Sequence, residues 1–363
     1  MRMLKPILLA LGVIAAALPA MAQAADAPRT KDGHSDLSGI WTNANLTPVS
    51  RPRGQTKLVV SAAEAKTIAD NGTIAGVPRS QAGLEDKIDP NLGAPEKGGS
   101  DFGAKGYNSF WLSTGDSLAL VKGEYRTSNI IDPPNGQIPH KDPAAVMAKA
   151  RVAGITYMTG VGKYEGPEEI GLAERCLLGF SGAAGPGILT PMYNNTYQFV
   201  QTPGYVVILS EMVHDARIIP IYKDAATARA SHKPSVIKPW IGDSVGWWDG
   251  DTFVSETTNI NPTQGAENVI PLSAKGKVTE RFQRYAKDEI FYSFTVEDSD
   301  KYSQPWTVEN SFRPRQALYE YACHEGNYGL PGILRGKRFE EERLAAAEKA
   351  KPGVKGAKVK GGQ

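Results

Sequence analysis

The chain has 363 residues, with 41 Lys and Arg against 39 Asp and Glu, 38 Gly, 25 Pro and two Cys. This length and mixed composition exclude a disordered, fibrous or disulfide-dense protein. The near balance of charge argues against a strongly basic nucleic-acid-binding protein, so we expect no nucleic-acid partner.

Residues 1–24 have the organisation of a cleaved secretory signal peptide. Arg2 and Lys5 give a positive start, an apolar run follows over 7–18, and Ala22-Gln23-Ala24 is a small-x-small cleavage motif. The apolar run is about 12 residues long, whereas a membrane-spanning helix needs about 20. We therefore predict cleavage after Ala24, no transmembrane segment, and a periplasmic location in a Gram-negative bacterium.

Residues 25–185 are expected to form an irregular N-terminal segment wrapped on the folded core. Gly, Pro, Asp, Asn and Lys recur there with few sustained hydrophobic periods. Short extended pieces are expected at 37–43, 110–121 and 127–131, and helices at 61–71 and 143–150.

Residues 186–335 are expected to form the β core. Extended runs recur at 193–201, 205–213, 217–222, 243–248, 252–259, 278–286, 290–297, 306–312 and 318–323. Most are joined by tight turns such as Asp249-Gly250-Asp251, and no helical crossover is evident between them. The pattern predicts a mainly β fold, an antiparallel up-and-down β-barrel of lipocalin-like character, because closing the sheet removes exposed edges. A β-sandwich is the alternative.

Residues 336–363 are expected to form a charged helix followed by a disordered basic tail. The stretch 339–349 is rich in Glu, Arg and Ala, which favours a helix. The tail, 351–363, carries four Lys and no acid, which is typical of a solvated end.

Cys176 and Cys323 are expected to pair. Thiols are oxidised in the exported compartment, and an even pair in a secreted chain favours one disulfide. The alternative is a catalytic thiolate at Cys323 activated by His324, but neighbours on a strand point to opposite faces.

Two short motifs suggest a serine hydrolase, and neither has the required context. Gly242-Asp243-Ser244-Val245-Gly246 matches G-x-S-x-G, but a hairpin follows it instead of the helix that a nucleophile elbow needs. Gly115-Asp116-Ser117-Leu118 resembles the start of the GDSL hydrolases, but Tyr321 stands where their Asp would precede His324. We expect neither motif to be catalytic.

No metal and no other cofactor is predicted. Five histidines are present and none pairs at ligand spacing: His34, His140, His214, His232 and His324. A metal site could assemble only across strands, from His214, His324, Glu211 and Glu325. No phosphate-binding loop or dinucleotide fingerprint is present.

Two polar clusters interrupt apolar strands and supply the catalytic candidates. The first contains Glu211, His214, Asp215 and Arg217, and the second, 320–328, contains His324 and Glu325. Glu211 shares a strand face with Tyr205, Val207 and Leu209, so we expect it to point inward and pair with Arg217. One interpretation is a structural ion pair at the barrel rim, and the other is an acid–base site in which a histidine titrates.

Three further glutamates and five aromatic residues complete the set of residues considered. The carboxylates expected to face solvent are Glu256, Glu280 and Glu297. The aromatic residues that would suit an apolar ligand cavity, or form simple core, are Tyr205, Trp247, Trp248, Trp306 and Tyr328.

From about Leu37 to Arg335 the chain resembles an uncharacterised family of secreted proteins of Gram-negative bacteria. The resemblance rests on these strings: Asp36-Leu37-Ser38-Gly39-Ile40-Trp41, Arg126-Thr127-Ser128, Asp132-Pro133-Pro134-Asn135-Gly136, Tyr205-Val206-Val207-Ile208, residues 211–220, 248–252 and 256–259, and Tyr321-Ala322-Cys323-His324-Glu325-Gly326-Asn327-Tyr328. It implies one exported folding unit and transfers no catalytic residue.

Three functional hypotheses follow. The first is an acid–base enzyme, a lyase, isomerase or hydrolase, acting on a hydrophobic or aromatic small molecule in the barrel. In it Glu211 or His214 acts as base, Arg217 stabilises negative charge, and His324 or Glu325 acts as acid. The second is a non-catalytic periplasmic carrier of a hydrophobic ligand, and the third an envelope interaction protein. Nothing in the sequence indicates an oligomeric state.

Overall fold

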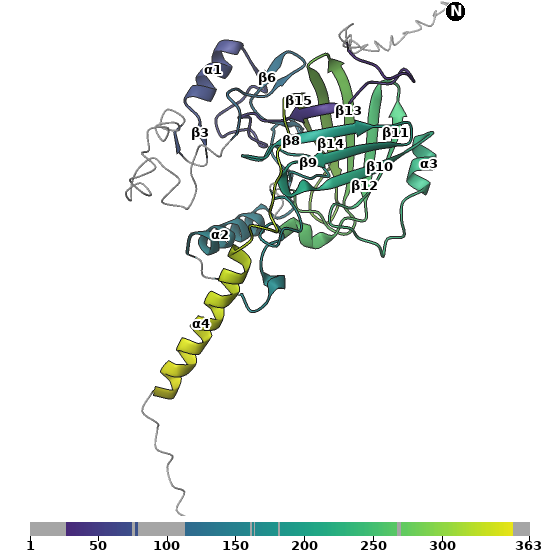
Figure 1. Cartoon of the computed structure of the whole chain (residues 1–363). Helices are drawn as coiled ribbons and strands as arrows, with labels where there is room; N and C mark the ends of the chain where they lie inside the picture. The colour runs from purple at the N-terminus through teal and green to yellow at the C-terminus, as the bar shows by residue number, and fades with distance from the viewer. Residues whose placement is uncertain are drawn as a thin grey trace, which may run out of the picture.

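The computed structural model describes residues 27–74, 77–78, 113–159, 162, 164–180, 182–266 and 270–350 (Figure 1). The predicted signal peptide, 1–24, and the basic tail, 351–363, lie outside the described residues, as do the first three residues of the extended run expected at 110–121. Of the described remainder of that run, 113–121, only Leu120–Val121 is a strand.

Nine strands close into a β-barrel, which confirms the predicted barrel over the sandwich. In order around the barrel they are β1 (Gly39–Thr42), β8 (Thr196–Gln201), β9 (Tyr205–Ser210), β10 (Ala216–Tyr222), β11 (Asp243–Asp249), β12 (Thr252–Thr258), β13 (Lys277–Ala286), β14 (Glu289–Glu297) and β15 (Trp306–Pro314). The barrel closes at β1, where Trp41 lies opposite both Tyr197 of β8 and Pro314 of β15.

The barrel is mixed and not strictly antiparallel as expected. Strands β10 and β11 run parallel, with Ile221 opposite Gly246. A parallel pair needs a crossover connection, and residues 223–242 supply it with the short helix α3 (Ala225–Ala230), which Figure 1 shows beside β11. Asp224 caps this helix by accepting a hydrogen bond from the backbone N–H of Thr227 at 2.7 Å.

The N-terminal segment does more than wrap the barrel, because it supplies the closing strand β1. It also adds β7 (Ile130–Asp132) to the outer edge of β15. The remaining short strands form two small sheets, β2 (Val59–Val60) with β6 (Glu124–Arg126) and β5 (Leu120–Val121), and β3 (Thr73–Ile74) with β4 (Val77–Pro78).

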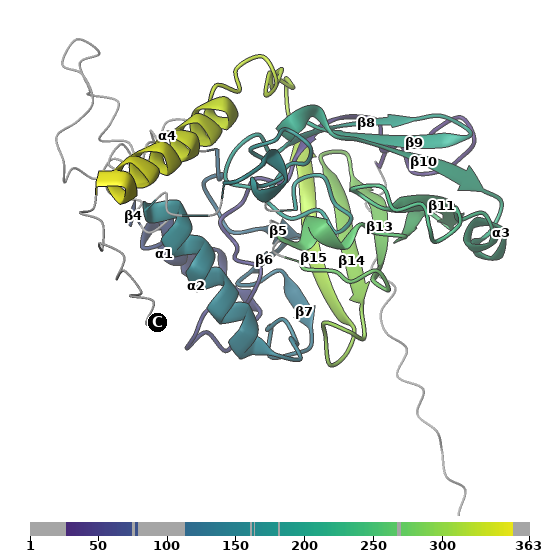
Figure 2. The ribbon, with the colours of Figure 1, turned by 90° about the horizontal axis from the view of Figure 1, so that it is seen from below.

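Unlike α3, the other three helices lie at the predicted positions, and two of them run longer than expected. They are α1 (Ala62–Asp70), α2 (Pro143–Thr159) and α4 (Gly329–Ala350), with 3-10 turns η4 (Pro167–Glu169), η5 (Met212–His214) and η6 (Pro262–Ala266). Helix α4 projects from the barrel, and α1 and α2 lie on the same side of the molecule as α4 (Figure 2). Within the described ranges, no helix is long and apolar enough to cross a membrane.

Residues 318–323, expected as a strand, lie in an irregular segment that turns over the end of the barrel. The disulfide Cys176–Cys323 is present, with the Cα atoms 5.8 Å apart, as predicted. The bond fastens this segment to the loop that follows η4.

Aromatic side chains occupy the barrel interior. Strands β13 and β14 alternate buried and partly exposed positions, so every second side chain enters the core. Phe282 packs on Tyr292 with ring centroids 4.8 Å apart, and Phe199 and Tyr292 both contact Phe312 at 5.4–5.5 Å. The interior is therefore a packed core.

Candidate functional site

A pocket of about 350 Å³ lies at the end of the barrel where β9 finishes. We call it the rim pocket. Its described lining residues come from the end of β9, from η5 and from the irregular segment: Leu209, Ser210, Glu211, His214, Leu318, Tyr319, Glu320, Tyr321, Ala322 and Glu325. Two segments distant in the sequence thus share one concave surface.

Glu211 lies in the wall of this pocket and is only 5% exposed. One carboxylate oxygen, Oε1, accepts a hydrogen bond from Asn194 Nδ2 at 2.7 Å. The other, Oε2, is buried and has no hydrogen-bond partner among the described residues. A buried carboxylate oxygen that no described group satisfies is costly, which marks Glu211 as a candidate ligand contact in this wall.

The strand-face expectation for Glu211 is wrong, although the residue is buried. Val206 and Ile208 face the core, whereas Tyr205 and Leu209 lie on the outer face. Glu211 follows the last residue of β9 and has helical backbone angles, so the alternation of the strand no longer fixes its direction.

His214 lies beside Glu211 on the same wall and is exposed. Its Nδ1 lies 3.3 Å from the carbonyl oxygen of Tyr321, which can only accept, so this contact places a proton on Nδ1 and leaves Nε2 as the acceptor of the neutral ring. The ring of His324 lies 6.0 Å away, centroid to centroid. Glu325 lines the pocket as well.

Asp215, next in the chain, titrates near neutrality. Burial raises the pKa of its carboxyl to about 6, although the hydrogen bond from Gly179 N–H and the charge of His214 act in the opposite direction. A carboxyl group that changes charge near pH 6 therefore lies directly beside the pocket residue His214.

The backbone around the rim pocket is strained. Val213 and His214 have φ of 58° and 47°, the left-handed region that a β-branched residue rarely adopts. Asn194, which binds Glu211, and Cys176, which anchors the opposite wall, also have positive φ. Four of the six such non-glycine residues in the described chain thus surround this pocket, and such strain concentrates at functional sites.

The irregular segment is fixed as the second wall by covalent and polar contacts. The disulfide joins Cys323 to Cys176. Asn327 Nδ2 donates to the carbonyl oxygen of Glu174 at 2.7 Å, on the same loop as Cys176. These contacts hold the second wall against the loop that contains Cys176.

Arg217 is not part of the rim pocket, and the expected pair with Glu211 is wrong. Arg217 is 3% exposed and forms an ion pair inside the barrel with Glu280, which is 0% exposed. The expectation that Glu280 faces solvent is therefore also wrong, as it is for the buried Glu256. Tyr292 Oη donates to Glu280 at 2.7 Å and completes a buried network.

The five predicted ligand-contact residues do not share one cavity. Trp306 is core, Trp247 packs under α3, and Trp248 stacks on His34 with centroids 4.4 Å apart. Tyr205, half exposed, begins β9, so the strand separates it from Glu211 by about 20 Å. Tyr328 is 84% exposed, beyond the second wall of the pocket.

The G-x-S-x-G motif lies in regular strand. Ser244 is in β11, and its Oγ lies 2.8 Å from Thr257 Oγ1 of the neighbouring strand. No helix N-terminus follows it, so the amides of an oxyanion hole are missing from this position.

A polar cluster that the sequence analysis missed lies under α3. His232 Nδ1 is 3.0 Å from Asp243 Oδ2, and its Nε2 is 3.8 Å from Glu256 Oε1. Burial alone would lower the pKa of His232, but the two carboxylates outweigh it and raise this pKa. Asp243 and Val245 lie on the same face of β11, and Val245 packs against Ala228 of α3. The alternation of residues along β11 could have indicated that Asp243 is buried on that face.

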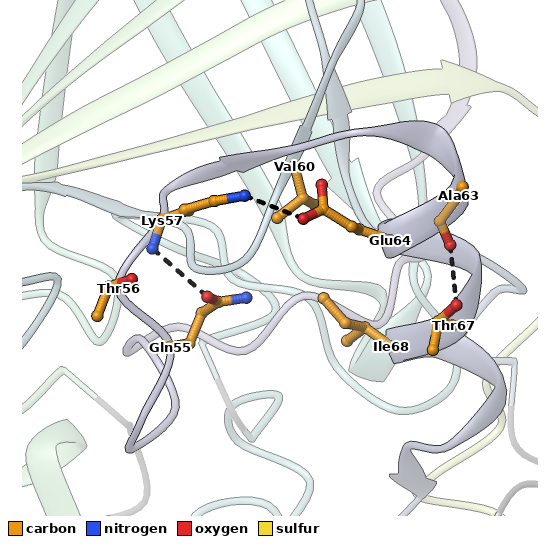
Figure 3. Close-up of a pocket in the computed structure, with 8 residues that line it drawn as sticks. All are labelled: Gln55, Thr56, Lys57, Val60, Ala63, Glu64, Thr67 and Ile68. Carbon is orange, nitrogen blue, oxygen red and sulfur yellow. Dashed lines mark hydrogen bonds and ion pairs between the residues drawn. The ribbon is translucent and has the colours of Figure 1, made fainter.

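A second pocket, of about 400 Å³, lies beside α1 (Figure 3). Its polar groups are used locally: Glu64 accepts from Ser61 in a capping box and pairs with Lys57 at 3.0 Å. Thr67 Oγ1 donates to the carbonyl oxygen of Ala63. Glu64 and Thr67, two polar residues of this pocket, therefore serve to cap and stabilise α1.

In the described part of the chain, no group of three or more His, Cys, Asp or Glu side chains is arranged to hold a metal ion. The rim-pocket residues His214, Glu211 and Glu325 share a surface without forming such a ligand set. No family model, no curated protein and no solved structure matches the chain.

Proposed function

We propose that the protein is an exported enzyme that performs acid–base chemistry on a small molecule bound in the rim pocket. The observation that carries this proposal is Glu211, a buried carboxylate in the wall of a pocket that it shares with His214 and Glu325. One of its oxygens accepts no hydrogen bond from any described residue. Carboxylate and imidazole groups that line one cavity are the components of general acid–base catalysis.

In this proposal Glu211 or His214 accepts a proton from the substrate, and Glu325 or His324 returns one. The neutral imidazole of His214 has a free Nε2 when Nδ1–H donates to the Tyr321 carbonyl. A lyase, an isomerase or a hydrolase would use this set of groups. Arg217 has no part in it, because Glu280 engages its guanidinium inside the barrel.

The carrier hypothesis receives less support. A carrier would hold its ligand in the barrel, where rings such as Phe282, Tyr292 and Phe312 pack on one another. Export is part of the proposal: the pattern of residues 1–24 and the disulfide both favour an oxidising compartment, which we place in the periplasm.

The test is a turnover screen with small apolar and aromatic esters, hydroxy acids and amines, using the wild-type protein and His214→Ala. We expect the variant to lose at least about a hundredfold in turnover, a common contribution of a general acid or base. Its thermal midpoint should be nearly unchanged because His214 is exposed. His140→Ala, outside the pocket, is the matched control. Full activity in His214→Ala would refute the proposal.

A further inference from the structure

The described residues that line the rim pocket are acidic without a compensating cation. Three glutamates contribute to the lining, Glu211, Glu320 and Glu325, and neither Lys nor Arg stands among the described lining residues. None of the three carboxylates forms an ion pair with another described residue. A concave surface of one charge concentrates ligands of the opposite charge.

Glu211 provides an independent indication of a ligand. It is buried, and Asn194 engages only one of its oxygens. The second oxygen, Oε2, accepts no hydrogen bond from any described group. A donor that carries positive charge is the strongest partner for it, since charge-assisted hydrogen bonds are about twice as strong as neutral ones.

The rest of the lining is apolar and aromatic. Leu209 and Leu318 offer aliphatic surface, and Tyr319 and Tyr321 add two phenol rings. Tyrosine rings bind apolar groups and also attract cations to their faces. Such walls suit a molecule with an apolar or aromatic body and one charged end.

We propose that the rim pocket selects organic cations, meaning small molecules with an ammonium or guanidinium group on an apolar or aromatic body. The Glu211 carboxylate in the pocket wall pairs with the cationic group, and Glu320 and Glu325 add long-range attraction. A bare metal ion fits less well, because the acidic and histidine side chains of the described chain form no ligand set. This inference rests on the proposed function for the location of the site, and extends it by naming the substrate class.

The test is calorimetric binding of three probes of nearly equal size and different charge: 2-phenylethylamine, 2-phenylethanol and phenylacetate. We expect the amine to bind at least about tenfold more tightly than the alcohol, and phenylacetate to bind weakest. Glu211→Gln should abolish the preference for the amine. Glu342→Gln, which removes an exposed carboxylate of α4, should retain it.

Glu320→Gln and Glu325→Gln test the same point without altering a buried group, in case Glu211→Gln does not fold. Each should weaken amine binding by a smaller factor that shrinks further in high salt, because both side chains are exposed. No binding of the amine at millimolar concentration would overturn the proposal. So would equal affinity for the amine and the alcohol, a preference that persists in all three variants, or displacement of the amine by equimolar Zn²⁺.

The binding and turnover experiments can refute the ligand class and the proposed enzyme activity independently. Amine binding that depends on Glu211, without turnover of any compound in the screen, would retain the ligand class and refute the enzyme. Turnover of neutral substrates that His214→Ala abolishes, with no preference for the amine, would retain the enzyme and refute the ligand class.

Discussion

Arg217 and Glu280 form a two-point ion pair inside the barrel, across strands β10 and β13. Arg217 Nη1 lies 3.0 Å from Glu280 Oε1, and Nη2 contacts Oε2. The N–H of Gly187 donates to the same Glu280 Oε1 at 3.2 Å. The pair therefore joins the barrel wall to the glycine-rich loop that contains Gly187.

Removing one partner of this pair should be severely destabilising. Arg217→Ala leaves the Glu280 carboxylate buried without its cation, and we expect a loss of about 3–5 kcal/mol in the free energy of unfolding. The double variant Arg217→Met with Glu280→Leu should recover much of that loss. Urea unfolding measures both, and a single-variant loss below about 1 kcal/mol would show that the pair is not a structural element.

The disulfide should stabilise the fold and hold the second wall of the rim pocket. For Cys176→Ser with Cys323→Ser we expect a loss of about 2–5 kcal/mol, because the bond closes a long loop in the unfolded chain. Ligand affinity should fall as well, since Cys323 lies within the lining segment 318–325. Unchanged affinity in the folded double variant would show that the segment holds its position without the bond.

Asp215 should make stability fall as the pH rises from about 4 to about 7. Burial raises its pKa in the folded state to about 6, above the ordinary value of 3.8. The folded protein therefore binds a proton more tightly than the unfolded chain, and this contribution is complete below pH 3.8 and lost as the pH passes 6.

Asp215→Asn removes this titration and keeps an acceptor for the Gly179 N–H. The stability of the wild type relative to the variant should decrease by up to about 3 kcal/mol over that pH range. Urea unfolding of the two proteins at matched pH gives the difference directly. A difference that does not vary with pH would contradict the assignment.

His232 should make stability depend on pH at higher values than Asp215 does. Its pKa in the folded state is raised above 6.5, so its contribution to stability is fully present below pH 6.5 and is lost as the pH rises through the raised value. His232→Gln should therefore cost more at about pH 6 than at about pH 9. Equal costs at the two pH values would indicate that Asp243 and Glu256 do not hold a charged imidazole.

The barrel was predictable because several neighbouring strands are joined by short turns: β8 to β9, β11 to β12, and β13 to β14. The closing strand β1 was not recognised as a barrel strand, because its partners β8 and β15 lie far along the chain. The parallel pair was missed because α3 within 223–242 is short and gives little periodic signal.

The rim pocket was predictable in part. Glu211, His214 and Glu325 were candidates from the sequence, and the structure brings them to one surface. The partners of buried charges were not predictable, since Glu211 binds Asn194 of the segment before β8, and Arg217 of β10 binds Glu280 of β13. Side-chain pairing over such distances depends on the barrel register, which no local pattern specifies.

The central claim, that the rim pocket is the ligand site, is tested most directly by NMR of the five histidine rings during titration with 2-phenylethylamine. His214 lines the pocket and the His324 ring lies 6.0 Å from it, centroid to centroid. His34, His140 and His232 lie elsewhere and act as internal controls. We expect the ring signals of His214 and His324 to shift together in a saturable manner, and the other three to stay in place. Shifts confined to His34, His140 or His232, or no shift at all, would contradict the claim.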